Sequence, residues 1–111
     1  MVLRKRFSGA GATAGEKEKS IVAKIKNHLE AIGFFVVKLH GSHFQRAGLP
    51  DLLALRDGQT VFFEVKRPGE KPTKLQKHVL DELVARGFVA CVVRSVADVE
   101  MVLEMESVSV S

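Results

Sequence analysis

The pair Asp57-Gly58 constrains the fold of this 111-residue chain more than any other feature. It lies between residues 51–55 and residues 60–66, two short apolar segments that have the length of strands. An Asp-Gly pair in this position favours a two-residue turn, so we predict an antiparallel hairpin. Residues equally distant from the turn then pair. Asp51 should therefore face Glu64, with their Cβ atoms about 5 Å apart, unless a bulge or a longer loop shifts the register.

Charged residues interrupt the second of these strands. Side chains alternate along a strand, so Glu64 and Lys66 share one face, and the predicted register adds Asp51 to it. Two carboxylates opposite each other destabilise a sheet, but a divalent cation between them reverses the sign, and Mg²⁺ favours such oxygen ligands. In the structural alternative, Asp51 caps a turn while Glu64 and Lys66 form an ion pair. All three residues on one face favour a metal-dependent catalytic site.

Three segments carry apolar residues at the three- and four-residue spacing of amphipathic helices. The first runs from about residue 16 and ends at Gly33, a residue type common just after a helix. The second starts at Thr73, where Gln76 completes a capping box, and it ends at Gly87. The third starts at Ser95. We therefore predict three helices.

Two further strands are predicted at residues 34–39 and 88–93. The order of elements is then α-β-β-β-α-β-α. Strands that are apolar on both faces imply a sheet covered by helices on both sides. We predict one small α/β domain at residues 16–106, with a mixed sheet flanked by helices, between a mobile tail at residues 1–15 and a fraying tail at residues 107–111.

Composition narrows the cellular setting and the class of partner. The formal net charge of +4 and the sequence pI near 9.5 permit an anionic partner such as nucleic acid. No apolar run approaches the roughly 20 residues needed to cross a bilayer, and residues 1–15 lack the apolar stretch of a secretory signal. The single cysteine, Cys91, cannot form a disulfide within one chain. We expect an intracellular, cytoplasmic protein with no membrane partner.

The sequence Pro50-Asp51, followed after twelve residues by Glu64-Val65-Lys66, resembles the PD-(D/E)XK nuclease motif. The predicted α-β-β-β-α-β order is similar to the restriction-endonuclease-like core of that superfamily. The resemblance is closer to the VRR-NUC family (virus-type replication-repair nucleases), and it covers roughly residues 16–98. It extends over GLPDLL with the preceding Arg46, FFEVKRPGEKPTKLQ with its Thr73-x-x-Gln76 motif, and GFVACVVRSVADV with its Val93-Arg94-Ser95 motif.

The resemblance implies a metal-dependent phosphodiesterase. Mg²⁺, for which Mn²⁺ can substitute, would be held by Asp51, Glu64 and the carbonyl of Val65. Lys66 would position or help to deprotonate the attacking water and would offset charge on the transition-state phosphorane; we prefer the positioning role. These residues would form the catalytic set.

Family members usually carry a further acidic residue on the first helix, and Glu16 and Glu18 are the candidates. Glu18 lies along the inward stripe, three residues before Ile21, so we choose it as a second-metal or water-mediated ligand. An acid in the first turn would also complement the helix dipole without any catalytic role. The resemblance also places Gln76 near the active site, although the capping box by itself explains this residue.

Polar and basic residues before Pro50 and around the start of the second helix could contact DNA phosphates. A solvated surface position is the simpler explanation for each of them. The candidates are His40, Ser42, His43, Arg46, Lys71, Lys74 and Lys77.

We expect a structure-selective DNA endonuclease for branched DNA such as four-way (Holliday) junctions, because the chain shows no separate sequence-reading module and similar stand-alone nucleases act in this way. A role in DNA repair and a phage origin, with action in the host cytoplasm, would fit. One alternative is a restriction-like or nicking nuclease on duplex DNA. Another is a non-catalytic nucleic-acid-binding module, against which the intact set of Asp51, Glu64 and Lys66 argues.

A homodimer is expected from the surplus of apolar residues. Phe34, Phe35, Phe88 and the valine-rich last helix exceed what one small sheet needs in its core, and such an excess often marks an interface. A twofold dimer also suits a twofold-symmetric junction, with one active site for each strand. The alternative is a monomer whose phenylalanines fill both faces of the sheet.

Overall fold

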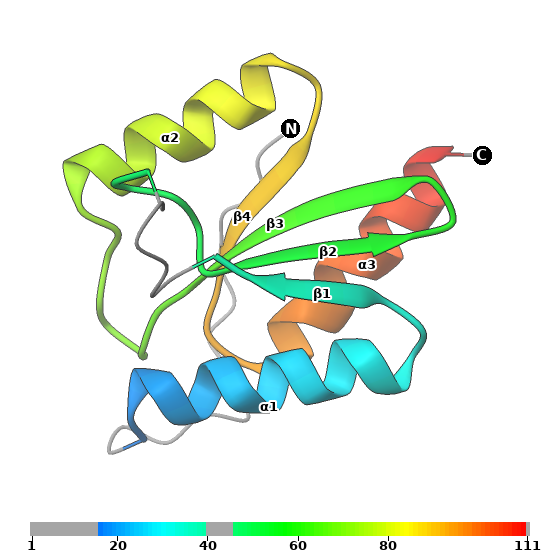
Figure 1. Cartoon of the computed structure of the whole chain (residues 1–111), viewed down its shortest axis with the longest axis horizontal. Helices are drawn as coiled ribbons and strands as arrows, with labels where there is room; N and C mark the ends of the chain where they lie inside the picture. Colours follow the sequence, from blue (N-terminus) through cyan, green and yellow to red (C-terminus); the bar gives the residue numbers. More distant parts are fainter. Residues whose placement is uncertain (1–15, 40–45, 111) are drawn as a thin grey trace.

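The computed structural model describes the backbone at residues 16–39 and 46–110 and the side chains at residues 16–39 and 46–106. Within these described residues, three helices and four strands follow one another in the predicted order (Figure 1). The elements are α1 (Glu18–Ala31), β1 (Phe35–Lys38), β2 (Leu52–Arg56), β3 (Gln59–Val65), α2 (Lys74–Ala85), β4 (Val89–Val93) and α3 (Val96–Val110).

The strands form one mixed sheet in the order β1-β2-β3-β4, which confirms the predicted fold class. β1, β2 and β3 are successively antiparallel, and β4 runs parallel to β3 after the crossover through α2. The hairpin has the expected register, because Leu52 pairs with Phe63 and Arg56 pairs with Gln59. Asp57 and Gly58 adopt positive φ angles of 50° and 78°, as the tight turn requires.

The main core lies between one face of the sheet and the helices α1 and α3. Alternate residues of β2, β3 and β4 point to this face and pack against the inward stripes of the two helices. Its fully or almost fully buried members include Ile25, Leu29, Leu52, Ala54, Val61, Phe63, Val65, Val93, Val99 and Val102. Ile25 and Leu29 of α1 and Val99 and Val102 of α3 form the inward stripes of these helices, whereas Ile32 at the end of α1 is 37% exposed.

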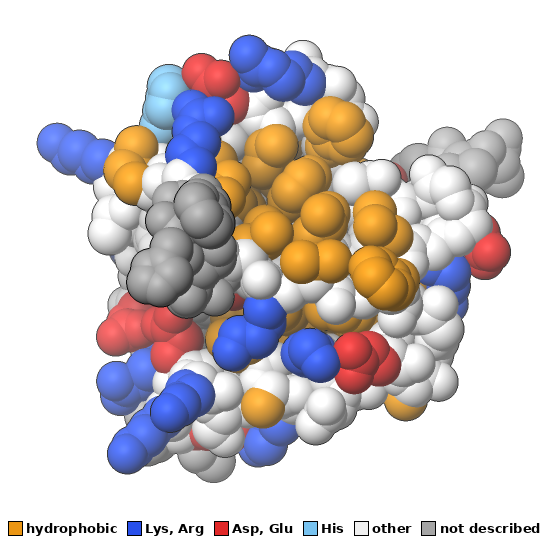
Figure 2. Space-filling view, in the orientation of Figure 1, with side chains coloured by type: hydrophobic (Ala, Val, Ile, Leu, Met, Phe, Trp, Pro, Cys, Tyr) orange, Lys and Arg blue, Asp and Glu red, His pale blue; other side chains and the backbone are white. Residues whose placement is uncertain are grey.

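The opposite face of the sheet is covered only in part. α2 contacts β4, where Val79 and Leu80 become buried, while the remaining strands lie beside it (Figure 1). Figure 2 shows a continuous apolar patch over this uncovered part of the sheet. We call it the open sheet face; it consists of Phe35, Val37, Leu53, Leu55, Phe62 and Phe88.

The residues that suggested a surplus of apolar surface are partly buried in the core and partly exposed. Phe34 is only 4% exposed, and Val99 and Val102 of α3 also belong to the core. Phe35 and Phe88, in contrast, are 68% and 41% exposed. Phe88 packs edge-on against Phe62, with the ring centroids 6.0 Å apart. Of these candidates, Phe35 and Phe88 on the open sheet face are the exposed ones.

The helix ends largely follow the predicted local signals. Thr73 and Gln76 form the full capping box at the start of α2, and Ser95 accepts a hydrogen bond from the backbone N–H of Asp98 at the start of α3. Gly33 and Gly87 follow α1 and α2 with positive φ angles of 99° and 93°. α3 continues to Val110, farther than the sequence predicts. No helix in the described ranges has the length and apolar character to cross a membrane.

Candidate active site

Glu64 is the central residue of the candidate site. It lies in β3 one position before the end of the strand and is only 1% exposed. Neither carboxyl oxygen accepts a hydrogen bond from any described residue. The Nζ of Lys66 lies 3.5 Å from Oε2, which is an ion pair without hydrogen-bond geometry. A buried carboxyl group with so few partners is costly for stability, so its presence favours a chemical role.

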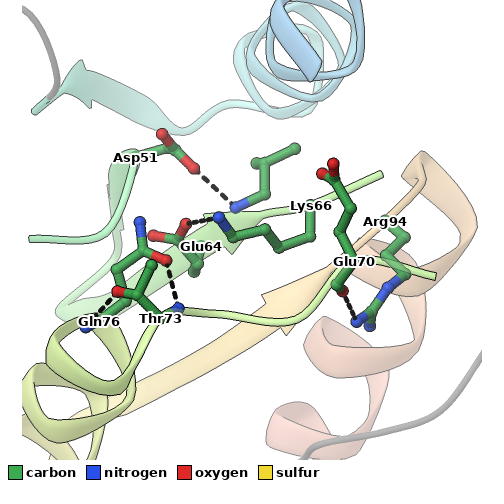
Figure 3. Close-up of polar contacts among 8 residues, drawn as sticks. Asp51, Glu64, Lys66, Glu70, Thr73, Gln76 and Arg94 are labelled. Carbon is green, nitrogen blue, oxygen red and sulfur yellow. Dashed lines mark hydrogen bonds and ion pairs between the residues drawn. The ribbon is translucent and has the colours of Figure 1, made fainter. Parts of the chain in front are cut away.

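Asp51 lies beside Glu64 at the same end of the sheet. It immediately precedes β2, one position beyond the paired residues Leu52 and Phe63, so the register places it across from Glu64 as predicted. Asp51 is 6% exposed, and its Oδ2 accepts a 2.8 Å hydrogen bond from the backbone N–H of Val65 (Figure 3). This bond holds one carboxylate oxygen in place against β3.

The proximity of the acids changes the protonation of Glu64. Burial, together with the negative charge of Asp51, raises the pKa of Glu64 from 4.5 to about 8, and Glu18 contributes in the same direction. The ammonium of Lys66 opposes this rise without cancelling it. A cation bound between the carboxylates would favour the ionised form of Glu64. The donor set therefore fits a hard divalent cation better than it fits a metal-free core.

Lys66 approaches the site along β3. Its side chain is 12% exposed, and its backbone N–H donates a 3.0 Å hydrogen bond to the carbonyl of Val93, so the pairing with β4 continues past Glu64. The strand thereby directs Lys66 to the same side as Glu64 (Figure 3). An ammonium held in this way can supply a positive charge next to the two acids.

The two acidic residues before and at the start of α1 differ in their surroundings. Glu18 lines a pocket together with Asp51, and its charge acts on Glu64. Glu16 forms an ion pair with Lys24 and accepts a hydrogen bond from the hydroxyl of Ser20; the Lys24 contact is the main cause of its lowered pKa. The geometry favours the choice of Glu18 over Glu16.

Gln76 is occupied by the capping box. Its Oε1 accepts a 3.0 Å hydrogen bond from the backbone N–H of Thr73, and its own N–H donates to the Thr73 hydroxyl at 3.1 Å (Figure 3). The cap fixes the start of α2. The helix lies at the end of the loop that leaves β3 after Lys66, so Gln76 stays a candidate for the site.

The remaining candidate DNA contacts are surface residues where the structure describes them. Arg46, Lys71, Lys74 and Lys77 are exposed, and Lys77 pairs with Asp81 at 3.0 Å. His40, Ser42 and His43 lie outside the described residues.

The sequence-based selection missed two lysines near the acids. Lys19 in α1 and Lys38 at the end of β1 line the pocket that contains Glu18 and Asp51. The signal for Lys38 was present: β1 is antiparallel to β2, so the last residue of FVVK reaches the end of the sheet where Asp51 begins the next strand.

The ligands that could hold a metal are few. No group of three or more His, Cys, Asp or Glu side chains in the described ranges is placed to bind a metal ion. Mg²⁺ needs fewer, because it keeps several waters and is commonly bound through one or two carboxylates. Asp51, Glu64 and the carbonyl of Val65, with Glu18 nearby, meet that requirement.

Comparison with protein families decides the membership of the chain. A family model described as archaeal Holliday junction resolvase (Hjc) matches residues 14–97. The chain belongs to the Hjc resolvase family. Among curated proteins, this Hjc-family chain is 36% identical over 80 residues to p44 of Acyrthosiphon pisum secondary endosymbiont phage 1, a protein named provisionally as a nuclease. The match covers 71% of the chain and 84% of p44.

Solved structures confirm the resemblance to VRR-NUC domains. One, described as a VRR_NUC domain, superposes on the Hjc-family chain with a TM-score of 0.68 and 35% sequence identity, covering 78% of this chain and 94% of the other. A second, described as a VRR_NUC domain protein, has a TM-score of 0.67, covers 82% and 88%, and supports the fold alone at 21% identity. Family and fold together identify the chain as a nuclease.

Proposed function

We propose that this protein is a metal-dependent endonuclease that cuts branched DNA, four-way junctions among them, as a homodimer. The observation that carries the catalytic part is Glu64, a 1% exposed carboxyl group that faces Asp51 and has an ammonium 3.5 Å away. Stability alone gives no reason to build such a cluster into a core strand.

The metal site consists of Asp51, Glu64 and the carbonyl of Val65, with Glu18 as a further or water-mediated ligand. Mg²⁺ is the proposed ion, and Mn²⁺ can substitute. When bound, the ion supplies polarisation of the scissile phosphate and a lowered pKa of the attacking water. The hydrogen bond from the Val65 N–H fixes the Asp51 carboxylate against β3, beside Glu64.

Lys66 is the proposed positioning residue for the attacking water. Its ammonium lies beside Glu64, where it can orient a water and offset the negative charge that develops on the phosphoryl oxygens. The largely enclosed position of Lys66 strengthens this electrostatic effect, because less water screens it. Gln76 at the start of α2 is a candidate for a weaker polar contact with the same site.

DNA is the proposed substrate class because the family is one of Holliday junction resolvases and the chain is basic, with a net charge of +4. The proposed phosphate contacts are His40, Ser42, His43, Arg46, Lys71, Lys74 and Lys77. A phage-encoded relative favours action inside a host cell. Branch-selective cutting would serve DNA repair or the resolution of replicating genomes.

The open sheet face supports a homodimer. It presents Phe35 and Phe88 to solvent, and monomeric proteins rarely leave a contiguous apolar patch of this kind uncovered. A second copy offers the same patch in return, as a twofold interface requires. Two catalytic sites would then act on two strands of one junction.

The test compares labelled four-way junctions with linear duplexes of the same sequence, in Mg²⁺ and in EDTA. We expect junction cleavage in Mg²⁺ and none in EDTA. Asp51→Asn should reduce cleavage by at least about a hundredfold, since it removes a ligand charge, while junction binding persists or tightens because repulsion of the phosphates falls. The Asn oxygen can still accept the Val65 N–H bond, so the fold should survive.

The alternatives predict different results in the same assay. A restriction-like or nicking nuclease would cut the linear duplex at least as well as the junction. A binding module would bind DNA but leave it intact in Mg²⁺ and Mn²⁺. Near-normal cleavage by Asp51→Asn would reject the proposed metal site.

A further inference from the structure

A pocket of about 370 Å³ opens between α1 and the end of the sheet that carries Asp51. Its lining carries charges of both signs: Glu18 and Asp51 are acidic, and Lys19, Lys26 and Lys38 are basic. Only the two acids belong to the proposed metal site, so the lysines have no role in the chemistry described so far.

The three lysines of the pocket differ in their partners. Lys26 forms an ion pair with Glu30. Neither Lys19 nor Lys38 forms an ion pair with any residue that the structure describes. Two ammonium groups without an ion pair, in a pocket whose acids are assigned to a metal, favour an anionic occupant.

The fold places the two lysines directly beside the end of the sheet that carries the candidate site. Lys38 is the last residue of β1 and pairs with Leu52, the neighbour of Asp51. The next residue, Leu39, donates its N–H to the carbonyl of Asp51 at 2.8 Å. Lys19 follows Glu18 in the first turn of α1. Each lysine is therefore adjacent in the chain or the sheet to one of the acids.

The walls of the pocket suit a nucleotide better than an isolated anion. Val22 and Ala23 of α1 line it with apolar surface, and Asn27 adds an amide that can donate a hydrogen bond. The volume lies within the range of small-molecule sites. A sugar ring can pack against the apolar wall while its phosphate meets the ammonium groups.

We propose that this pocket binds the nucleotide next to the cleaved bond, with Lys19 and Lys38 on its phosphate. The proposal rests on the proposed nuclease function and extends it. The scissile phosphate lies at the proposed metal site, and Lys19 and Lys38 beside its acids receive the neighbouring phosphate of the same strand. The pocket thereby fixes the position of the strand along the metal site, which no residue of the catalytic set can do alone.

The test uses junctions whose cleaved strand carries one neutral methylphosphonate, moved in turn over the two phosphates on each side of the cut. Affinity is measured by fluorescence anisotropy in EDTA, where binding is separated from cleavage. Three proteins are compared: the wild type, Lys19→Ala/Lys38→Ala, and Lys17→Ala/Lys24→Ala. The last removes the same charge from α1 and the residue before it, at positions that do not line the pocket.

We expect the wild type to lose affinity when one flanking phosphate is neutralised. Lys19→Ala/Lys38→Ala should bind unmodified junction about tenfold more weakly and should lose nothing further at that one position, while neutralisation elsewhere still weakens it. For this variant, the slope of log K against log salt concentration should fall in magnitude by about one, because one phosphate contact is lost. The control pair should respond to every methylphosphonate as the wild type does.

The proposal would be overturned if the affinity losses from the lysine substitutions and from the methylphosphonate added at every phosphate position. It would also be overturned if the control variant lost as much affinity as Lys19→Ala/Lys38→Ala. Both lysines are exposed, so unchanged thermal unfolding of the variants is expected and excludes misfolding. The nuclease proposal is judged separately. The wild type could lose affinity at the one flanking phosphate, and the double variant could lose nothing further there, while the wild type fails to cut the junction in Mg²⁺. In that case the nucleotide-binding pocket is supported and the catalytic assignment is rejected.

Discussion

At the scale of single residues, the burial of Glu64 lowers the stability of the fold, and this loss of stability marks the candidate site. A carboxyl group that is 1% exposed loses its hydration, and no described donor replaces it with a hydrogen bond. The ion pair with Lys66 at 3.5 Å compensates only in part, and Asp51 makes ionisation harder. The residue therefore stores an electrostatic penalty that a bound cation would relieve.

This penalty predicts a pH dependence of stability in EDTA. The folded pKa of Glu64, about 8, exceeds its ordinary value of 4.5, so the folded state holds the proton more tightly than the unfolded state. The contribution of the protonated group is complete below pH 4.5 and is lost as the pH rises through about 8. Glu64→Gln stays neutral throughout, so its unfolding temperature should exceed that of the wild type more at pH 9 than at pH 5.

Scanning calorimetry in EDTA should show this gap widening by at least about 4 °C, which corresponds to roughly 1 kcal/mol in a domain of this size. Glu104→Gln, a change at an exposed position of α3, serves as the control and should show a constant gap. A constant gap for Glu64→Gln as well would mean that Glu64 is already satisfied in the folded protein.

The two acids at the α1 end provide a second prediction at this scale. Glu18→Gln should slow junction cleavage at least about tenfold, because Glu18 lines the pocket with Asp51 and acts on Glu64. Glu16→Gln should leave the rate nearly unchanged, since Glu16 pairs with Lys24 away from that pocket. Single-turnover rates measure both. A greater loss of rate for Glu16→Gln would show that Glu16, and not Glu18, is the acid that acts at the metal site.

At the scale of elements, the start of α2 and the loop before β2 support each other. Gly48 lies so close to α2 that a Cβ added there would meet the Cγ of Leu75 at 2.7 Å and its backbone oxygen at 3.2 Å. Its φ of 84° also favours glycine. Three residues later the loop reaches Asp51. The capping box of Thr73 and Gln76 fixes the α2 surface on which this loop rests.

Gly48→Ala tests this arrangement, and Gly58→Ala is a matched control. Both positions have positive φ, but nothing lies within 4 Å of a Cβ added at Gly58. We expect a cost of about 1 kcal/mol for Gly58→Ala from backbone strain alone, and about 1–3 kcal/mol more for Gly48→Ala from the contact with α2. Only Gly48→Ala should also slow cleavage, because the displaced loop carries Asp51. Denaturant melts and cleavage rates together measure the two effects, and equal costs would show that the loop does not rest tightly on α2.

At the scale of the whole molecule, the three helices cover the sheet unequally. α1 and α3 both pack on one face, whereas α2 contacts the other face at β4. The apolar patch of the open sheet face lies on this less protected side (Figure 2), and the register places Asp51 and Glu64 of the candidate site on the same face. A partner bound there would lie next to both active site and substrate, so assembly and cleavage are expected to be linked.

Phe35→Lys should convert the proposed dimer into a monomer, because it places a charge at the most exposed apolar residue of the open sheet face. The change lies on an edge strand, where lysine is well tolerated, so the fold should be retained. Met105→Lys, at a 48% exposed position on α3, is the control and should remain dimeric. Light scattering measures the mass, and paired junction cuts should fall only in Phe35→Lys. A wild type that is monomeric at assay concentrations would reject the interface.

The sequence by itself determined the local structure and the central acids. Some features depend only on neighbours in the chain: the helix caps, the Asp57-Gly58 turn and the alternation of side chains along β3. They could therefore be predicted from the sequence, and the structure confirms them. The turn alone fixed the register, and the register brought Asp51 to Glu64 across thirteen positions. The catalytic motif was accessible for the same reason.

Only the tertiary structure decided which apolar residues face water and which surface residues share a pocket. Phe34 and Phe35 are adjacent and chemically identical, yet the packing of α1 and α3 against one face buries the first and exposes the second. Lys19 and Lys38 are distant in sequence and carry no motif. They line one pocket because α1 packs beside β1 at the end of the sheet where β2 begins. Such proximity arises from long-range packing, which no local pattern encodes.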